Sequence, residues 1–237
     1  YEAALATVDE CVRNLVCVGA DPDRIAILDN FCWPSCSKPE NLASLVRAAE
    51  GCYDAAKAYR TPFVSGKDSL NNQLRLADGR VIEIPPTLLI TGMGIVPDVS
   101  KCVTMDLKAR ERGTSLLLIR PHGTDFPSDW SGITVPDYGQ AVGRHARVTS
   151  PLEARGVAAF VADLIHRRWV SACHDSSEGG PLVAIAEMAL SSQDRESDIG
   201  LAVDLFALHE IVPAARRKVE DPSVWIARTF REATGSY

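Results

Sequence analysis

Residues 61–72 read TPFVSGKDSLNN, and this stretch decides how the first hundred residues are interpreted. Its apolar start is typical of a buried strand, and the glycine that follows predicts a turn at the end of that strand. In the turn, Gly66 would let a ligand approach the backbone, while Lys67 would supply a positive charge and Ser69 a hydroxyl donor. With the carboxylate of Asp68 between them, the turn is a candidate cradle for a phosphate group or a metal–nucleotide complex. The alternative is an ordinary strand-ending turn with polar surface residues.

A second glycine segment, HDSSEGG at residues 174–180, precedes an apolar helix predicted over 181–191. Free N–H groups at the helix start, beside Gly179 and Gly180, would suit an anion. Asp175 or Glu178 could instead hold Mg²⁺ together with phosphate oxygens. The alternative is a helix N-cap that only satisfies the backbone. We expect the 66–69 turn and this bend to line one phosphate-sized pocket.

Asp29 ends a third segment of interest, the apolar run RIAILD at residues 24–29. β-Branched residues in this run predict a buried strand. Polar residues at the carboxyl end of such a strand often face a ligand crevice in α/β proteins, although a simple turn is the alternative.

The remaining pattern predicts a two-part chain. Helices are expected at 2–19, 39–59, 151–169 and 181–191, with further strands at 87–96, 115–119, 170–173 and 201–205 and a hairpin turn at 78–79. Strands and helices mix in the first hundred residues and alternate afterwards, which indicates an α+β unit at 1–100 followed by an α/β unit at 101–237.

Bulk properties narrow the class of protein. The 237 residues carry 31 acidic and 25 basic side chains, so the net charge of −6 argues against a nonspecific grip on nucleic acid. No apolar run approaches the roughly 20 residues that span a membrane. Seven cysteines at irregular spacings indicate free thiols in a reducing compartment, and Cys32 and Cys36 lack the partners of a zinc site. We therefore expect a cytoplasmic protein, with an upstream region missing because the sequence does not begin with Met.

Taken in order, four stretches resemble the second half of phosphoribosylformylglycinamidine synthase. They are GADPDRIAILDNFCWP (19–34), TPFVSGKDSLNN (61–72), TLLITGMGIVPD (87–98) and HDSSEGGPLVAIAEMA (174–189). The resemblance implies a PurM-like fold, related to aminoimidazole ribonucleotide (AIR) synthase, in which an α+β half-barrel unit precedes an α/β unit. It also implies a ligase of purine biosynthesis that uses ATP and Mg²⁺. Such a ligase converts formylglycinamide ribonucleotide to the amidine with ammonia from a glutaminase subunit or domain.

Residue by residue, the resemblance implies that Asp29 and Gly66 contact ATP and that Ser69 contacts substrate. Asp175 falls in a loop like the one that carries a metal-binding Asp in the first repeat of the family. Three departures matter. Lys67 stands where many members carry a metal-binding Asn, residues 206–237 do not resemble the family, and the repeat with the catalytic His is absent. We therefore expect no catalytic residue in this chain, which would be a fragment inactive by itself.

Two other functions stay open from the sequence. The first is a noncatalytic, auxiliary nucleotide-binding module that stabilises an assembly. The second is another PurM-like ATP-dependent synthetase or kinase. In each case a half-barrel would expose an unpaired sheet, so we expect pairing with the first repeat or with a second copy of the chain.

Overall fold

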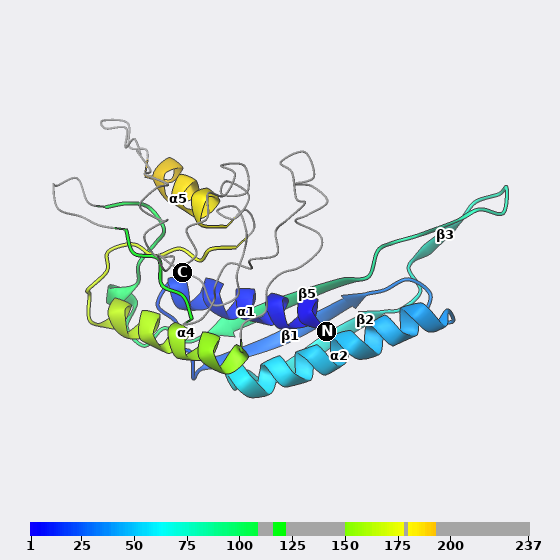
Figure 1. Cartoon of the computed structure of the whole chain (residues 1–237), viewed down its shortest axis with the longest axis horizontal. Coiled ribbons are helices and arrows are strands. Elements are labelled where there is room, and N and C mark those ends of the chain that lie inside the picture. Colours follow the sequence, from blue (N-terminus) through cyan, green and yellow to red (C-terminus); the bar gives the residue numbers. More distant parts are fainter. Residues whose placement is uncertain (109–115, 122–149, 178–179, 193–237) are drawn as a thin grey trace, which may run out of the picture.

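The computed structural model describes residues 1–108, 116–121, 150–177 and 180–192. Figure 1 shows an elongated molecule in which a hairpin arm projects at one end and two helices, α4 and α5, lie at the other. The helices are α1 (Glu2–Cys17), α2 (Pro39–Tyr59), α4 (Pro151–His166) and α5 (Gly180–Leu190), with a 3-10 turn η1 (Val99–Lys101). The strands are β1 (Ile25–Cys32), β2 (Phe63–Ser69), β3 (Gln73–Arg75), β4 (Val81–Glu83) and β5 (Thr87–Gly94).

Three strands form the central sheet, in the order β2-β1-β5. β1 runs parallel to β2, with a register shift between Ile27 and Leu28, and antiparallel to β5. Asp29 is opposite Gly66 in this ladder, and Cys32 is opposite Ser69. The predicted turn at 66–69 is therefore wrong: these residues continue β2, because each of them pairs with a residue of β1.

Helices α1 and α2 cover one face of the sheet. The β1 side chains of Ile25, Ile27 and Phe31 alternate toward these helices and are buried. Gly92 of β5 lies so close to α1 that an added Cβ would stand 2.6 Å from Cys11 Sγ. A glycine is therefore needed at this position for the helix to pack against the sheet.

Helix α4 extends the same core. Its buried residues Ala158, Val161 and Ile165 pack in one cluster with Val12 and Ile27. The residues before and after position 100 thus share a hydrophobic core. The division into domains at 1–100 and 101–237 stays a prediction.

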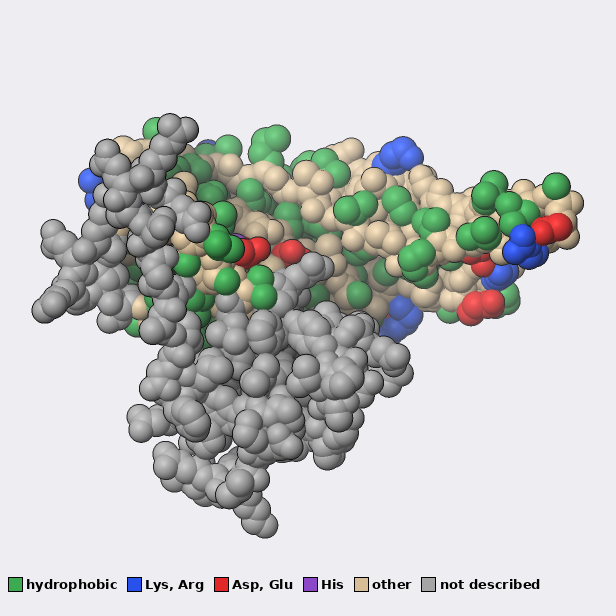
Figure 2. All heavy atoms as spheres, turned by 90° about the horizontal axis from the view of Figure 1, so that it is seen from above, with side chains coloured by type: hydrophobic (Ala, Val, Ile, Leu, Met, Phe, Trp, Pro, Cys, Tyr) green, Lys and Arg blue, Asp and Glu red, His purple; other side chains and the backbone are tan. Residues whose placement is uncertain are grey.

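Strands β3 and β4 form a hairpin that projects from the body (Figure 1). The predicted turn at Asp78 and Gly79 is confirmed, with Gly79 in the left-handed region at φ 85°. Figure 2 shows hydrophobic side chains along this arm and charges of both signs near its tip. The exposed apolar residues of the arm include Leu74, Val81 and Ile82.

Several sequence predictions are corrected or lie outside the described residues. Residues 116–119, the described part of an expected strand, are not in a strand; the apolar run finds no partner strand in the described parts of the chain. The 170–173 strand is reduced to one bridge between Thr104 and Ala172. The predicted strand at 201–205 and the tail 206–237 lie outside the described residues. Within the described segments, no helix combines the length and apolar character needed to cross a bilayer.

Candidate functional site

A pocket of about 630 Å³ opens between α2 and the edge strand β2. One part of its wall is apolar and comes from α2 and the sheet. The other part is polar and contains the two carboxylates of the site. The lining residues are Asp29, Phe31, Leu45, Ala49, Phe63, Val64, Ser65, Gly66, Asp68 and Leu70.

Asp29 and Gly66 meet in this pocket as neighbours in the β1–β2 ladder. A Cβ built on Gly66 would stand 2.4 Å from Asp29 Oδ1 and 2.9 Å from Asp29 Cγ. The glycine therefore leaves the space that the carboxylate occupies. Both residues were predicted as nucleotide contacts, and the structure brings them together.

Strand alternation separates the other members of the predicted cradle. Asp68 lies in the pocket with Gly66, whereas Lys67 and Ser69 are not among the lining residues and pair with Asn30 and Cys32. Lys67 Nζ donates a hydrogen bond to Ser69 Oγ at 3.0 Å. The expected single cradle of 66–69 is thus wrong, because successive side chains of a strand point to opposite faces. Ser69 and Lys67 share one face, and Gly66 and Asp68 the other.

The electrostatics of the pocket favour a cation or a ligand with hydrogen-bond donors. Burial raises the pKa of Asp29, and the nearby carboxylate of Asp68 raises it further, while the Lys67 backbone N–H acts in the opposite sense. On α2, burial and then the charge of Asp29 raise the pKa of Cys52 to about 11. No Lys or Arg is among the lining residues. An anionic ligand would therefore need a counterion here.

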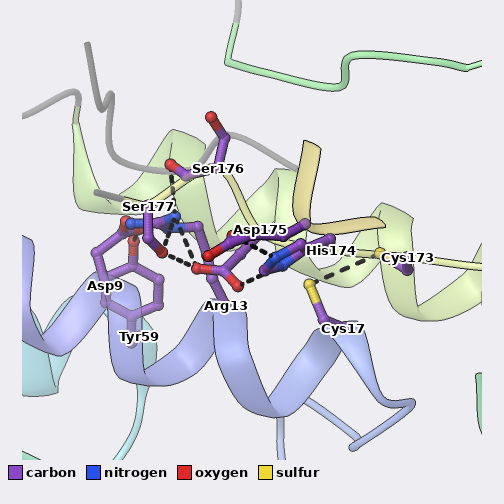
Figure 3. A network of polar contacts seen from close by, with 10 residues as sticks. Asp9, Arg13, Cys17, Tyr59, Cys173, His174, Asp175, Ser176 and Ser177 are labelled. Carbon is purple, nitrogen blue, oxygen red and sulfur yellow. Dashed lines mark hydrogen bonds and ion pairs between the residues drawn. The ribbon is translucent and has the colours of Figure 1, made fainter. Parts of the chain in front are cut away.

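A second polar cluster surrounds Arg13 on α1 (Figure 3). The guanidinium group donates to Asp9 Oδ2 at 2.7 Å and to the Ser176 carbonyl at 3.0 Å, and it lies 3.3 Å from Asp175 Oδ2. Tyr59 of α2 donates a short hydrogen bond to Asp9. Arg13 is 1% exposed, so this cluster joins α1, α2 and the 173–177 segment inside the protein.

Asp175, the predicted phosphate or metal residue, has protein partners on both carboxylate oxygens. Ser177 Oγ donates to Oδ2, and His174 Nδ1 lies 3.3 Å from Oδ1. Burial alone would raise the pKa of Asp175, but the bonds from His174 and Ser177 and the charge of Arg13 lower it overall. A metal ion at Asp175 would have to displace these partners, and the metal role of this residue stays a prediction.

His174 extends the cluster to α5, because its Nε2 lies 3.0 Å from Glu187 Oε2. The hydrogen bond with Asp175 raises the pKa of His174 despite partial burial, and Glu187 adds to the effect. At the other end, Cys17 Sγ lies 3.7 Å from Cys173 Sγ, within hydrogen-bond distance for sulfur. This sulfur contact lowers the pKa of Cys173 and raises that of Cys17.

The described residues of the second glycine segment are not among the residues that line the pocket between α2 and β2. The pocket wall is drawn from residues 29–70, whereas Asp175 and Ser176 are buried against α1. Gly180 begins α5 at φ 69°, and positions 178–179 lie outside the described residues. The expectation of a shared phosphate-sized pocket is therefore wrong for the described residues.

Sequence reasoning missed Asp9 and Arg13, which form the buried centre of the second cluster. A signal was present: the two residues are spaced i, i+4 on the face of a helix that is otherwise apolar. An acid–base pair on such a face indicates a buried ion pair.

Comparisons with known proteins agree with this architecture. Residues 1–96 match the family model of AIR synthase related protein, N-terminal domain. The chain is 35% identical over 194 residues to phosphoribosylformylglycinamidine synthase subunit PurL of Synechococcus sp. (strain CC9902), covering 80% of this chain and 25% of that protein. It is 37% identical over 212 residues to the same subunit of Deinococcus radiodurans, covering 87% of this chain and 27% of the relative. The chain thus spans about a quarter of the length of these relatives.

A solved structure, T. maritima PurL complexed with AMPPCP, matches with a TM-score of 0.52 and 16% identity. The match covers 81% of this chain and 26% of that chain. At this identity the likeness shows the fold alone. Together with the family match, it confirms the predicted α+β, PurM-like fold.

Proposed function

Because residues 1–96 belong to the AIR synthase related family and the chain is similar to PurL subunits over 80% of its length, we propose that it is a nucleotide-binding unit of an ATP-dependent ligase. The observation that carries this proposal is the pocket in which Asp29 and Gly66 meet beside an apolar wall. Phe31, Leu45 and Phe63 offer apolar contact to a base, and Asp29 offers a carboxylate to a ribose hydroxyl group or a metal ion. The related T. maritima PurL was solved with AMPPCP.

Mg²⁺ fits the same pocket better than it fits Asp175, whose carboxylate oxygens already have protein partners. Mg²⁺ is commonly held by one or two carboxylates together with phosphate oxygens and water. Asp29 and Asp68 supply such a pair, and the charge of the metal would offset that of the phosphates in a pocket that has no basic side chain among its described lining residues. We assign these two carboxylates as the groups that would hold the metal–nucleotide complex, where the ion would neutralise phosphate charge.

The wider reaction is proposed from the relatives. The parent ligase would convert formylglycinamide ribonucleotide to formylglycinamidine ribonucleotide in purine biosynthesis, with ATP and with ammonia from a glutaminase subunit or domain. Ser69, on the face of the sheet away from the pocket, would contact this substrate. The protein would act in the cytoplasm, together with a first PurM-like repeat or a second copy of itself.

Nucleotide binding to this chain tests the proposal directly. Calorimetric titration with ADP and Mg²⁺ should show binding to the wild-type chain. In Gly66→Ala the new methyl group would displace the Asp29 carboxylate, so the affinity should fall by about tenfold or more, equivalent to about 1.4 kcal/mol.

Gly156→Ala is the matched control. Gly156 lies in the exposed part of α4, where nothing stands within 4 Å of an added Cβ. This variant should bind like the wild type, and circular dichroism should show that both variants are folded. A wild-type chain that does not bind the nucleotide, or equal affinities in the two variants, would argue against the pocket as its site.

A further inference from the structure

Two cysteines that are distant in the sequence lie against each other. Cys17 ends α1, and its Sγ is 3.7 Å from Cys173 Sγ, across a separation of 156 residues. Both are free thiols, with Cys17 buried and Cys173 only partly buried. The proposed ligase function uses neither of them.

This is one of two side-chain contacts between α1 and the 173–177 segment that are spaced alike along both. Arg13 contacts Asp175, and one helical turn further along α1 Cys17 contacts Cys173. Residues spaced i, i+4 lie on one face of a helix, and residues spaced i, i+2 lie on one side of an extended segment. The step from Arg13 to Cys17 on the helix therefore corresponds to the step from Asp175 to Cys173 on the segment. The buried contact between Arg13 and Asp175 keeps the two sulfur atoms next to each other.

We propose that Cys17 and Cys173 form a reversible disulfide that ties the end of α1 to the 173–177 segment. The sulfur atoms must approach from 3.7 Å to about 2.05 Å. Residues 173–177 belong to neither a helix nor a strand, so this side of the contact can adjust. The opposite side is fixed, because Cys17 lies in a packed helix.

A low-molecular-weight disulfide such as oxidised glutathione supplies the oxidant. The more accessible Cys173, as thiolate, attacks one sulfur of that disulfide, so a mixed disulfide forms and one small thiolate leaves. Cys17, as thiolate, then attacks the Cys173 sulfur and releases the second small thiolate. The two protein thiols lose two electrons and two protons, and the small disulfide gains them as two thiols.

Peptide mapping after oxidation tests this pairing. The full chain is incubated with oxidised glutathione, alkylated under denaturing conditions and cleaved with trypsin. Cys17 falls in the peptide 14–24 and Cys173 in the peptide 169–195, each as its single cysteine. We expect these two peptides to be joined through a disulfide that a reductant cleaves, with the other five of the seven thiols alkylated. The melting temperature of the oxidised chain should rise by several degrees.

Three variants complete the test. Cys102→Ser removes an exposed cysteine and should leave the cross-link and the thermal shift unchanged. Cys17→Ser and Cys173→Ser should each abolish both, and the second keeps the test valid if the first does not fold. Seven alkylated thiols after oxidation, a stable glutathione adduct on Cys173, or a cross-link to another cysteine would each overturn the proposal.

Discussion

Arg13 is a buried cation at the centre of a cluster that joins three segments of the chain. Its partners are Asp9 on its own helix and Asp175 and Ser176 in the 173–177 segment, while Tyr59 of α2 donates to Asp9. Removing water from such charges is costly, and the ion pairs and hydrogen bonds offset that cost only while every partner is present. The residue therefore links the stability of α1 to the position of the later segment.

Replacing Arg13 with Met should destabilise the protein strongly. The carboxylates of Asp9 and Asp175 would stay buried without their cation, at a cost of about 3–5 kcal/mol. Urea denaturation measures this loss. Arg167→Met is the matched control, because Arg167 and Asp163 form an i, i+4 pair in which both side chains are exposed. A similar shift of the urea midpoint in both variants would contradict the role given to Arg13.

Asp29 shows how one residue can be identified from sequence while its surroundings are not. The family resemblance implied a nucleotide contact for Asp29, for which the sequence position alone left a simple turn open, and the structure places this residue in the pocket with Gly66. The sequence placed Asp29 at the end of a strand, but it did not predict that Gly66 lies within one. Their side chains are polar or absent, and only pairing between β1 and β2 extends the strands through them.

At the scale of elements, the helices were predicted closely because their apolar residues repeat at helical spacing. The first helix was expected over residues 2–19, and α1 ends at Cys17, two residues before Gly19 at φ 102°. Strands were less predictable, since a strand depends on a partner that can be distant in the sequence. The apolar run at 116–119 has no such partner in the described chain, whereas the polar end of β2 does.

The segment from 174 to 180 was predicted as a candidate ligand loop for a related reason. Its Asp, Ser and Gly residues are those of an anion or metal site, but Asp175 and Ser176 instead satisfy a buried arginine. Only the partner residues decide between the two roles. Arg13 lies 162 positions away from Asp175, so local spacing could not indicate the ion pair.

His174 should make the attachment of α5 dependent on pH. Its pKa is raised in the folded protein, first by the hydrogen bond with Asp175 and also by Glu187. A raised pKa stabilises the fold below the ordinary histidine value of about 6.5, and this stabilisation is lost as pH rises through the folded-state pKa. The stability gap between the wild type and His174→Gln should therefore be larger at low pH, by about 1 kcal/mol.

Thermal denaturation of the two proteins across this pH range measures the gap. Glu187→Gln removes one of the two acidic partners that raise the pKa of His174. In this background, the stability difference caused by His174→Gln should therefore disappear at a lower pH. A gap that is constant with pH, or one that widens as pH rises, would be incompatible with a charged His174 in the folded protein.

The two faces of the central sheet differ, because the described helices α1 and α2 cover only one of them. Gly92 and Gly94 of β5 face α1, and the alternating residues Leu89 and Met93 lie on the opposite face, 52% and 73% exposed. Apolar side chains on an uncovered sheet face favour association with another protein surface. We infer that this face pairs with a first repeat or with a second copy of the chain.

Self-association in solution tests that inference. Analytical ultracentrifugation should show the wild-type chain forming dimers as its concentration rises. A charge on the paired face would have to be desolvated, so Met93→Lys should shift the equilibrium toward the monomer. Leu152→Lys provides the comparison, because Leu152 is 69% exposed but lies on α4, away from the sheet face. Equal effects of the two substitutions would remove the sheet face from consideration, and a wild type that is monomeric at every concentration would restrict the partner to another chain.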